Sequence, residues 1–533
     1  MYKVVDLFAG AGGLSLGFLQ TKKFDIKVAF ENNPDMQKTY KKNYPYVDVQ
    51  GDVCQADYSV IQDKYGKIDI VIGGPPCQGF SNANRQQNHA INKNNMLVRQ
   101  FVRAILELQP SAFVMENVSM LQSETHRFYY SRHDRELINK YSIPIKKGNL
   151  CLLEKEFAFR GAVSIVKDKE KVRKYTWTNK DYTEFNIVFR ASDNPQKLQE
   201  ALGKHKENLI KIANKRTFSH PSNHIECQTN KTFSTILKYY AGESNLEEVK
   251  SEIAPTIMIQ RMFSIVHEIE ENGIVVDGYS STNGINAKIR SFAVYDYLKA
   301  VLQSEKNGYT INDGVICAAD FGAPQKRMRF VVMGVKKEIT HVVKLPKGPF
   351  SENNYRTVRQ AIEDIEDVLP VYDAEESIKG TPIERKSGLS ELAKSLRDSD
   401  TLKNHLITRT TGTALERFRA LKQGENFHAL AKSLKENTYT NVSRTQNTIY
   451  LRLNYDMPSG TVVNVRKSMW IHPTIDRAIS VREAARLQTF PDSFVFLGSK
   501  DKQYQQVGNA VPPFMAKAIA TELAYYLDSR AEQ

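Results

Sequence analysis

The sequence predicts an α/β fold built around a mostly parallel sheet. Four apolar runs have the length and composition of buried strands, at residues 2–8, 27–30, 68–72 and 112–115. Each run ends at glycines or at a polar side chain, and helical patterns begin at Leu14 and at residues 96–109. Buried strands that alternate with helices favour βαβ units, in which the strands are parallel.

Composition limits the classes of protein to which the chain can belong. Its 533 residues can fill two or three domains, and no apolar run approaches the length of a membrane span. The five cysteines are scattered, which fits a reducing compartment, and no secretory signal precedes the first strand. The net charge of +14 favours a polyanionic partner such as nucleic acid, although many basic proteins have none. We therefore expect a cytoplasmic protein without a membrane partner.

The first strand leads into a turn suited to a nucleotide-like cofactor. The turn Phe8-Ala9-Gly10-Ala11-Gly12-Gly13 opens a helix, where glycines let the backbone approach a ligand closely. Glu31 follows the second strand about twenty residues later, where an acid commonly holds ribose hydroxyls. Asp52 follows a further short strand and suits an adenine amino group. The set predicts an adenosine-containing cofactor, whereas the glycine-rich turn alone is equally typical of a plain tight turn.

A cysteine stands on a stiff turn after the third strand, in the stretch Gly73-Gly74-Pro75-Pro76-Cys77-Gln78-Gly79-Phe80-Ser81. The carboxyl ends of strands are where open α/β sheets bind ligands, so the Cys77 thiol could be a nucleophile. On its own, an inert cysteine in a tight turn explains the stretch better. The polar residues 82–95 that follow, with Arg85, form either a loop that closes over a phosphate backbone or a solvated linker.

Two further groups of polar residues follow predicted strands. Glu116 ends the strand 112–115, and an acid after four apolar residues is costly unless it is paired or functional. Gln325, Arg327 and Arg329 alternate between strands expected around 314–319 and 329–334. In an extended segment they would project the same way and suit an anionic or carbonyl-rich ligand. The alternative is a charged strand edge.

The α/β pattern is interrupted by residues 121–290, which are rich in lysine and aromatic residues and which we interpret as an inserted domain. Strands are expected at 149–159 and 182–189, and a helix at 194–214. His220, His224 and Cys227 suggest zinc, but no fourth ligand has finger-like spacing, so no metal site is predicted.

The pattern resumes with a helix expected at 292–304, and the remaining elements are predicted from residue 340 onward. Ser480 and Glu483 form a capping box that predicts a helix over 480–488. The other expected elements are a helix at 357–365, strands at 450–453 and 461–465, a polar turn at 505–513 that could return to the cofactor site, and a last helix at 514–527.

Taken in order, these motifs resemble those of the DNA (cytosine-5)-methyltransferases. The resemblance covers residues 2–120, about 290–335 and 445–525. The matching residues are Asp6 to Gly13, Glu31, Gly51-Asp52-Val53, Pro75-Pro76-Cys77-Gln78 with Phe80-Ser81, Glu116-Asn117-Val118, Gln325 to Arg329, Arg482 to Gln488 with Phe490-Pro491, and Gly508-Asn509-Ala510-Val511. The resemblance implies a doubly wound, Rossmann-like sheet that binds S-adenosylmethionine, with a smaller target-recognition domain and a large insertion.

The resemblance also implies the role of each site residue. Cys77 would add to C6 of a cytosine, Glu116 would hold or protonate N3, and Arg329, supported by Arg327, would bind O2. Because C6 is hidden in a stacked duplex, the base must be flipped out, and Ser81 and Arg85 would contact the DNA. The positions that match the family's cofactor contacts are Phe8, Gly10, Gly12, Glu31, Asp52, Pro76, Leu97 and Asn509.

The expected domains are a first part of the catalytic and cofactor-binding core (1–120), the inserted domain (121–290), a second part of the core (291–340), a target-recognition or small domain (341–470) and a C-terminal return to the core (471–533). The family places target recognition between the Gln-x-Arg-x-Arg motif and the helix at 480–488. We expect the insertion to share in recognition, with a partner-binding or stabilising role as the alternative.

The implied activity is methyl transfer to a cytosine in duplex DNA, by a monomer that modifies DNA in a bacterial or phage restriction–modification system. An RNA cytosine methyltransferase of the same fold would explain the charge equally well, but the Cys-Phe-Thr tripeptide typical of that branch is missing. The third hypothesis is a catalytically silent DNA-binding regulator. It is disfavoured because every expected catalytic position carries the residue type that the family uses.

Overall fold

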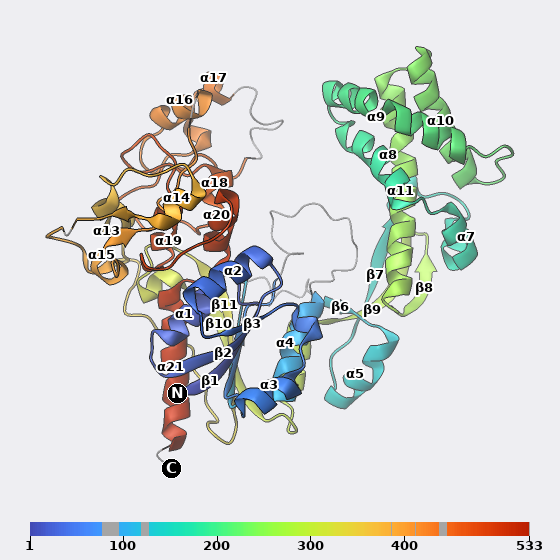
Figure 1. Cartoon of the computed structure of the whole chain (residues 1–533). Helices are drawn as coiled ribbons and strands as arrows, with labels where there is room; N and C mark the ends of the chain where they lie inside the picture. The colour runs from blue at the N-terminus through green and yellow to red at the C-terminus, as the bar shows by residue number, and fades with distance from the viewer. Residues whose placement is uncertain (77–94, 119–126, 385, 411, 436–444, 532–533) are drawn as a thin grey trace. The chain divides into compact units, whose positions relative to one another are not determined.

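The computed structural model describes residues 1–76, 95–118, 127–384, 386–410, 412–435 and 445–531. The chain forms two compact units (Figure 1). The catalytic unit comprises residues 1–80, 96–123 and 301–533, and the inserted unit comprises residues 81–95 and 124–300. Within the described ranges, no helix has the combined length and apolarity that a membrane span requires.

A seven-stranded sheet organises the catalytic unit, in the order β10-β11-β5-β4-β1-β2-β3. Neighbouring strands from β3 to β5 are parallel, whereas β11 is antiparallel to both of its neighbours. The chain leaves β1 in one direction and later returns on its other side with β4, so the sheet is doubly wound with a switch point between these strands. The predicted fold class is confirmed. The strands are β1 (Tyr2–Leu7), β2 (Phe24–Phe30), β3 (Asp48–Gln50), β4 (Ile70–Gly73), β5 (Ala112–Asn117), β10 (Tyr309–Cys317) and β11 (Met328–Lys336).

Helices cover both faces of this sheet. On one face, α1 (Gly13–Leu19) and α21 (Pro513–Ala531) pack together over alternate strand residues such as Ile72 and Val114, which are fully buried. On the other face, Tyr58 of α3 (Tyr58–Tyr65) contacts Phe30, and Phe101 of α4 (Asn95–Leu108) contacts Phe113. Because β4 and β5 are buried on both faces, their apolar runs are continuous, as the sequence indicated.

Residues 358–510 form a second core that reaches the glycine-rich turn. Ala9 and Ala11 of that turn lie in one hydrophobic cluster with Trp470 and Phe490, together with Tyr40 of α2 (Pro34–Asn43). The helices of this part are α13 (Val358–Ile362), α14 (Ala374–Lys379), α15 (Glu391–Leu396), α16 (Thr413–Ala420), α17 (Lys432–Lys435), α18 (Val465–Ser468), α19 (Val481–Leu487) and α20 (Lys500–Asn509). The predicted capping box of Ser480 and Glu483 is present at α19.

The inserted unit combines an antiparallel sheet with a group of helices. The strands β6 (Arg127–Tyr129), β7 (Lys146–Leu153) and β8 (Val276–Ser280) all pair with β9 (Ile285–Ala293). A separate apolar cluster joins the long helices, and in it the rings of Trp177, Phe185 and Phe233 contact one another. The helices are α5 (Arg135–Tyr141), α6 (Ala162–Lys167), α7 (Lys169–Tyr175), α8 (Asn179–Ala191), α9 (Pro195–Arg216), α10 (His224–Ala241), α11 (Leu246–Glu271) and α12 (Val294–Leu302), the last of which spans the boundary between the units.

Four local predictions are wrong. Residues 182–189 lie in α8, because Tyr182, Phe185 and Phe189 have the spacing of one helix face. Residues 155–157 form a 3₁₀ turn, so the strand expected at 149–159 ends at Leu153. The polar turn expected at 505–513 belongs mostly to α20, which ends at Asn509.

The fourth error concerns the two strands expected at 450–453 and 461–465. Tyr450 has a φ of 53°, which interrupts an extended chain. The N–H of Val462 donates to Gln325 and its C=O accepts from Arg327, so side chains occupy the groups that a strand would pair. Asn464 then caps α18.

Candidate active site

The glycine-rich turn after β1 has the backbone that its sequence predicts. Phe8, Gly10 and Gly12 all have positive φ, of 59°, 57° and 94°. A Cβ on Gly12 would collide with the Tyr44 ring, and one on Gly13 with the carbonyl oxygen of Val511. Glycine is therefore required where other segments approach the turn. Around Gly10 a Cβ would meet nothing within 4 Å, so that side of the turn is open.

The two predicted acids occupy different positions beside this turn. Glu31 is half-buried, and its Oε2 accepts from the N–H of Gly10 at 2.9 Å, while Oε1 accepts from the N–H of Asn33 at 2.7 Å. Burial raises the pKa of the Glu31 carboxyl, and these amide hydrogen bonds oppose the change. Asp52 is exposed and caps the 3₁₀ turn Val53–Gln55 through the N–H of Cys54. Glu31 is thus held rigidly against the turn.

Asp6, Ser15 and Tyr40 form a buried polar cluster next to the turn, which was not predicted from the sequence. The Ser15 hydroxyl lies 2.6 Å from both Asp6 Oδ2 and the Tyr40 hydroxyl. Burial raises the pKa of Asp6 to about 7, Ser15 lowers it, and the nearby Glu31 raises it further. The signal available in the sequence was an acid inside an otherwise apolar strand, which needs a partner.

The stiff turn after β4 is held by the neighbouring strand. The side-chain amide of Asn117, at the end of β5, donates to the carbonyl oxygen of Pro75 at 3.0 Å. A Cβ at position 74 would lie 3.1 Å from Glu116 Oε2, so Gly74 leaves room for that carboxylate. Pro76 is half-buried at the end of the described turn. Cys77, Ser81 and Arg85 lie outside the described residues.

Glu116 and Arg329, separated by 213 positions, meet at the edge of the sheet. The pairing of β11 with β5 brings them together, and Arg329 Nε lies 2.6 Å from Glu116 Oε1. The side chains are 15% and 12% exposed, so the ion pair is sheltered but accessible. The structure therefore brings together Glu116, Arg329 and the Pro75–Pro76 turn at the carboxyl ends of β4 and β5.

Arg327 does not share the position of Arg329, although both lie in the same motif. Its guanidinium is buried and donates to the carbonyl oxygens of Val462 at 2.8 Å and Gly508 at 3.0 Å. Burial and the nearby Arg329 lower the pKa of Arg327. Gln325 is also buried and bonds Leu487, Gln488 and Val462. These two side chains tie the loop before β11 to the second core.

The two remaining predicted cofactor contacts lie on helices. Leu97 is half-buried in the first turn of α4, and Asn509 is exposed at the end of α20. Residues 510–511, which follow Asn509, pack against Gly13. The chain thus returns to the glycine-rich turn after a helix, whereas the sequence had suggested a polar turn.

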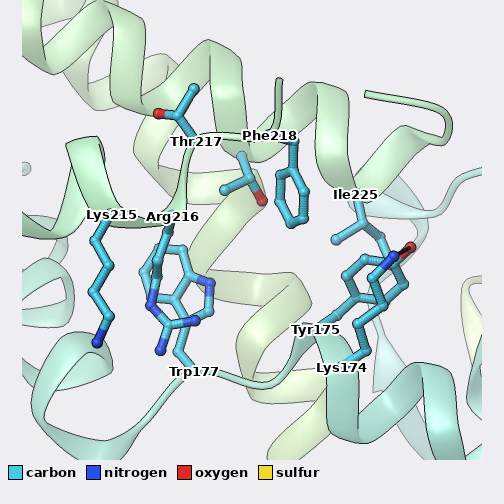
Figure 2. A pocket seen from close by; sticks show the side chains of 9 residues that line it. Lys174, Tyr175, Trp177, Lys215, Arg216, Thr217, Phe218 and Ile225 are labelled. Atoms are coloured by element: carbon cyan, nitrogen blue, oxygen red, sulfur yellow. Dashed lines mark hydrogen bonds between the residues drawn. The ribbon is translucent and has the colours of Figure 1, made fainter. Parts of the chain in front are cut away.

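The inserted unit has a cavity of its own, with a volume of about 330 Å³ (Figure 2). Arg216 lies beside the Trp177 ring and pairs with Asp181 at 2.6 Å. Lys174 lies over the Tyr175 ring and pairs with Glu226 at 3.1 Å.

His224 stacks on Phe159 at 4.4 Å, and no cluster of three metal-ligating side chains occurs in the described residues.

Comparison with known proteins identifies the family. The family model for C-5 cytosine-specific DNA methylases matches residues 2–140 and 289–524. The type II methyltransferase M.DdeI of Desulfomicrobium norvegicum is 22% identical, over 99% of this chain and 89% of its own. The DNA (cytosine-5-)-methyltransferase M.ApeKI of Aeropyrum pernix is 26% identical, over 99% of both chains.

A solved structure shares the fold. It is that of an E. coli prophage protein described as a DNA modification methyltransferase, and it aligns with a TM-score of 0.54, 20% identity and coverage of 99% of this chain and 100% of its own. The family model omits residues 141–288, which lie within the inserted unit, and matches the sheet and the second core on either side. The chain belongs to the C-5 cytosine-specific DNA methylases and is a DNA (cytosine-5)-methyltransferase.

Proposed function

We propose that the chain transfers a methyl group from S-adenosylmethionine to C5 of a cytosine flipped out of duplex DNA, through a covalent bond between Cys77 and C6. The observation that carries this proposal is the Glu116–Arg329 ion pair beside the Pro75–Pro76 turn that leads to Cys77. Activation of a cytosine ring requires a nucleophile, an acid and a guanidinium, and the described residues supply the acid and the guanidinium at one sheet edge.

The residues would act in sequence on the ring. Cytosine C5 is a poor nucleophile, and addition of the Cys77 thiolate to C6 gives it enamine character. Glu116 holds or protonates N3, which draws electron density from the ring, while Arg329 orients the base at O2. Arg327, which is buried, keeps the Arg329 strand in place. After methyl transfer, loss of the C5 proton and expulsion of Cys77 restore the enzyme.

The glycine-rich turn would hold the cofactor, which supplies an electrophilic methyl group when bound. The turn has positive φ at Phe8, Gly10 and Gly12 and is open at Gly10, where Glu31 accepts the backbone N–H with a fixed carboxylate. These features suit a ribose and its hydroxyls. Asp52, Pro76, Leu97 and Asn509 are proposed as further contacts.

Exposed lysines of helix α9 in the inserted unit could contribute to DNA binding. Lys197, Lys204, Lys211 and Lys215 of α9 recur at intervals of seven or four residues, and all are exposed, as are Glu200 and Glu207 between them. At 3.6 residues per turn this spacing places the lysines along one side of the helix. Such a row could neutralise DNA phosphates, with Ser81 and Arg85 contacting the strand near the extruded base.

The biological setting proposed is the modification half of a restriction–modification system in the cytoplasm of a bacterium, encoded by the host or by a phage. The relatives are named as type II methyltransferases, which supports this assignment. We propose that the chain acts as a monomer on DNA.

The experiment that tests the proposal measures transfer of a labelled methyl group to duplex DNA. We expect Cys77→Ser to lower kcat by a factor of about 10³ or more, because the bond to C6 no longer forms. Cys151→Ser is the matched control, since Cys151 is exposed on β7 and should leave the rate unchanged. Full activity of Cys77→Ser would refute the covalent route.

The substrate is tested by offering duplex DNA and transfer RNA to the same enzyme. Label in the DNA alone is the expected result, and the methylated cytosines, which resist bisulfite conversion, then give the recognition sequence by bisulfite sequencing. Label in the RNA alone would favour the RNA methyltransferase of the same fold.

A further inference from the structure

A second cavity lies in the catalytic unit, beside the N-terminal half of α21. Its volume is about 400 Å³. Three of its lining residues are cationic, Lys347, Arg356 and Lys517, whereas one carboxylate, Glu522, occurs among the described lining residues. Glu522 accepts a hydrogen bond from the Tyr526 hydroxyl at 2.9 Å. The cavity therefore carries an excess of positive charge.

Arg356 lies between two aromatic rings. Its guanidinium lies 5.0 Å from the Phe350 ring and 5.9 Å from the Phe514 ring. In the described part of the chain Arg356 forms no ion pair. Burial lowers the pKa of Arg356 and the negative charge of Glu391 opposes this change, but the Glu391 carboxylate itself pairs with Lys394 at 2.6 Å. Ring contacts hold a guanidinium without using its N–H donors, which are then free to bind an anion.

The cavity adjoins the loop that carries Arg327. A Cβ on Gly322 would lie 2.9 Å from the Phe350 ring and 3.5 Å from the Arg356 guanidinium carbon, so glycine permits this packing. Tyr355 donates to Asp320 at 2.6 Å, and the N–H of Phe350 bonds the Asp320 carbonyl oxygen at 3.2 Å. The segment that presents Arg356 is thus fastened to the 3₁₀ turn Ala318–Phe321, which precedes the Gln325–Arg329 motif.

We propose that this cavity binds a phosphate group through the Arg356 guanidinium, with Lys347 and Lys517 at its rim. A planar guanidinium matches two oxygens of a phosphate, and the lysines add charge without fixed geometry. The phosphate belongs either to the DNA backbone, in which case the inference rests on the proposed function, or to a free phosphate compound. Binding at this place would fix the loop that leads to Arg327 and Arg329.

The DNA arm of the test compares Arg356→Gln with Arg359→Gln. Arg359 is three residues away and is paired with Glu363 and Asp456, so the control removes an equal charge outside the cavity. Binding of duplex DNA is measured from 50 to 200 mM NaCl. For a backbone site, Arg356→Gln should lower the slope of log Kd against log salt by about 0.9 and raise the KM for DNA, while the affinity for the cofactor stays unchanged.

The second arm measures the Tm of the full chain with inorganic phosphate, against chloride at the same ionic strength. This arm needs no methyl transfer, so it separates failure of the site from failure of the proposed function. A Tm increase that is lost in Arg356→Gln, with the DNA slope unchanged, assigns the site to a free phosphate compound. The double variant Lys347→Gln/Lys517→Gln replaces Arg356→Gln if that variant is unstable. Identical behaviour of the cavity variants and Arg359→Gln in both arms would overturn the proposal.

Discussion

Two guanidinium–carboxylate pairs in the catalytic unit have similar partners and different surroundings. At the sheet edge, Arg329 and Glu116 are 2.6 Å apart and 15% and 12% exposed. Arg486 of helix α19 and Asp492, which follows that helix, are fully buried, and Arg486 also donates to Asp364 and the Ala361 carbonyl oxygen. Arg329 and Glu116 can each exchange the other for a ligand, whereas all three guanidinium nitrogens of Arg486 donate to groups within the protein.

The comparison shows that the type of residue does not decide whether an arginine serves function or stability. A buried ion pair is costly to break because the remaining charge has no solvent, and an accessible pair can reorganise at little cost. Variants of the two pairs should therefore separate activity from stability, and the following predictions test that separation.

The largest expected effect is on activity, at Glu116. Glu116→Gln keeps the shape of the side chain but removes the charge and the proton, so we expect kcat to fall by about 10² to 10⁴, as for a general acid or base. The Tm should change by less than about 2 °C, because the pair is accessible. Steady-state kinetics and thermal unfolding measure both quantities. Glu363→Gln, which breaks an exposed pair with Arg359, is the control and should leave both unchanged.

The second prediction concerns the buried pair. Arg486→Met leaves Asp492 and Asp364 without their common partner, and we expect the free energy of unfolding to fall by about 3–5 kcal/mol. Urea unfolding measures this loss. The folded fraction should keep its affinity for the cofactor. A loss of kcat with unchanged stability would show that α19 belongs to the active site, and the distinction between the pairs would fail.

A smaller effect is expected from Arg329→Lys. A lysine keeps the positive charge but lacks the planar fork, so the base would be oriented less well. We expect kcat/KM for DNA to fall by roughly tenfold, which corresponds to about 1.4 kcal/mol. Arg327→Lys should instead lower stability, because Arg327 bonds two carbonyl oxygens in the interior. Equal kinetic losses in both variants would contradict the different roles given to the two arginines.

The smallest effect is a pH dependence from the buried core around α19. His405 lies between Ser480 and the Val368 carbonyl oxygen, and burial lowers its pKa to about 4. The unfolded chain gains a proton on this histidine near pH 6.5, so stability should fall as the pH drops from 6.5 toward 4. Between pH 7.5 and 5.5 the expected loss is roughly 1 kcal/mol.

Urea unfolding of wild type, His405→Gln and His341→Gln at both pH values checks this expectation. His341 is exposed and is the matched control. The His405 variant should lose about 1 kcal/mol less on acidification than the control. An equal loss in the two variants would show that His405 titrates normally.

Prediction from sequence succeeded where a local pattern carries the information. The strand, turn and helix of residues 2–19 follow from one apolar run and its glycines, and the cap at Ser480 follows from Glu483 three positions later. It failed at residues 461–465, where Val462 gives its backbone groups to Gln325 and Arg327. A β-propensity pattern has no information about side chains that approach from elsewhere in the chain.

The sequence by itself determined the fold class, the family and the residue types that the chemistry needs, because strand ends, glycine turns and capping boxes are local. Only the tertiary structure decided which arginine of the motif is accessible. Arg327 bonds carbonyl oxygens 135 and 181 positions away, and Arg329 meets Glu116 through the pairing of β11 with β5. Burial and hydrogen-bond partners depend on such distant contacts, so the same residue type two positions apart serves stability in one place and a proposed catalytic role in the other.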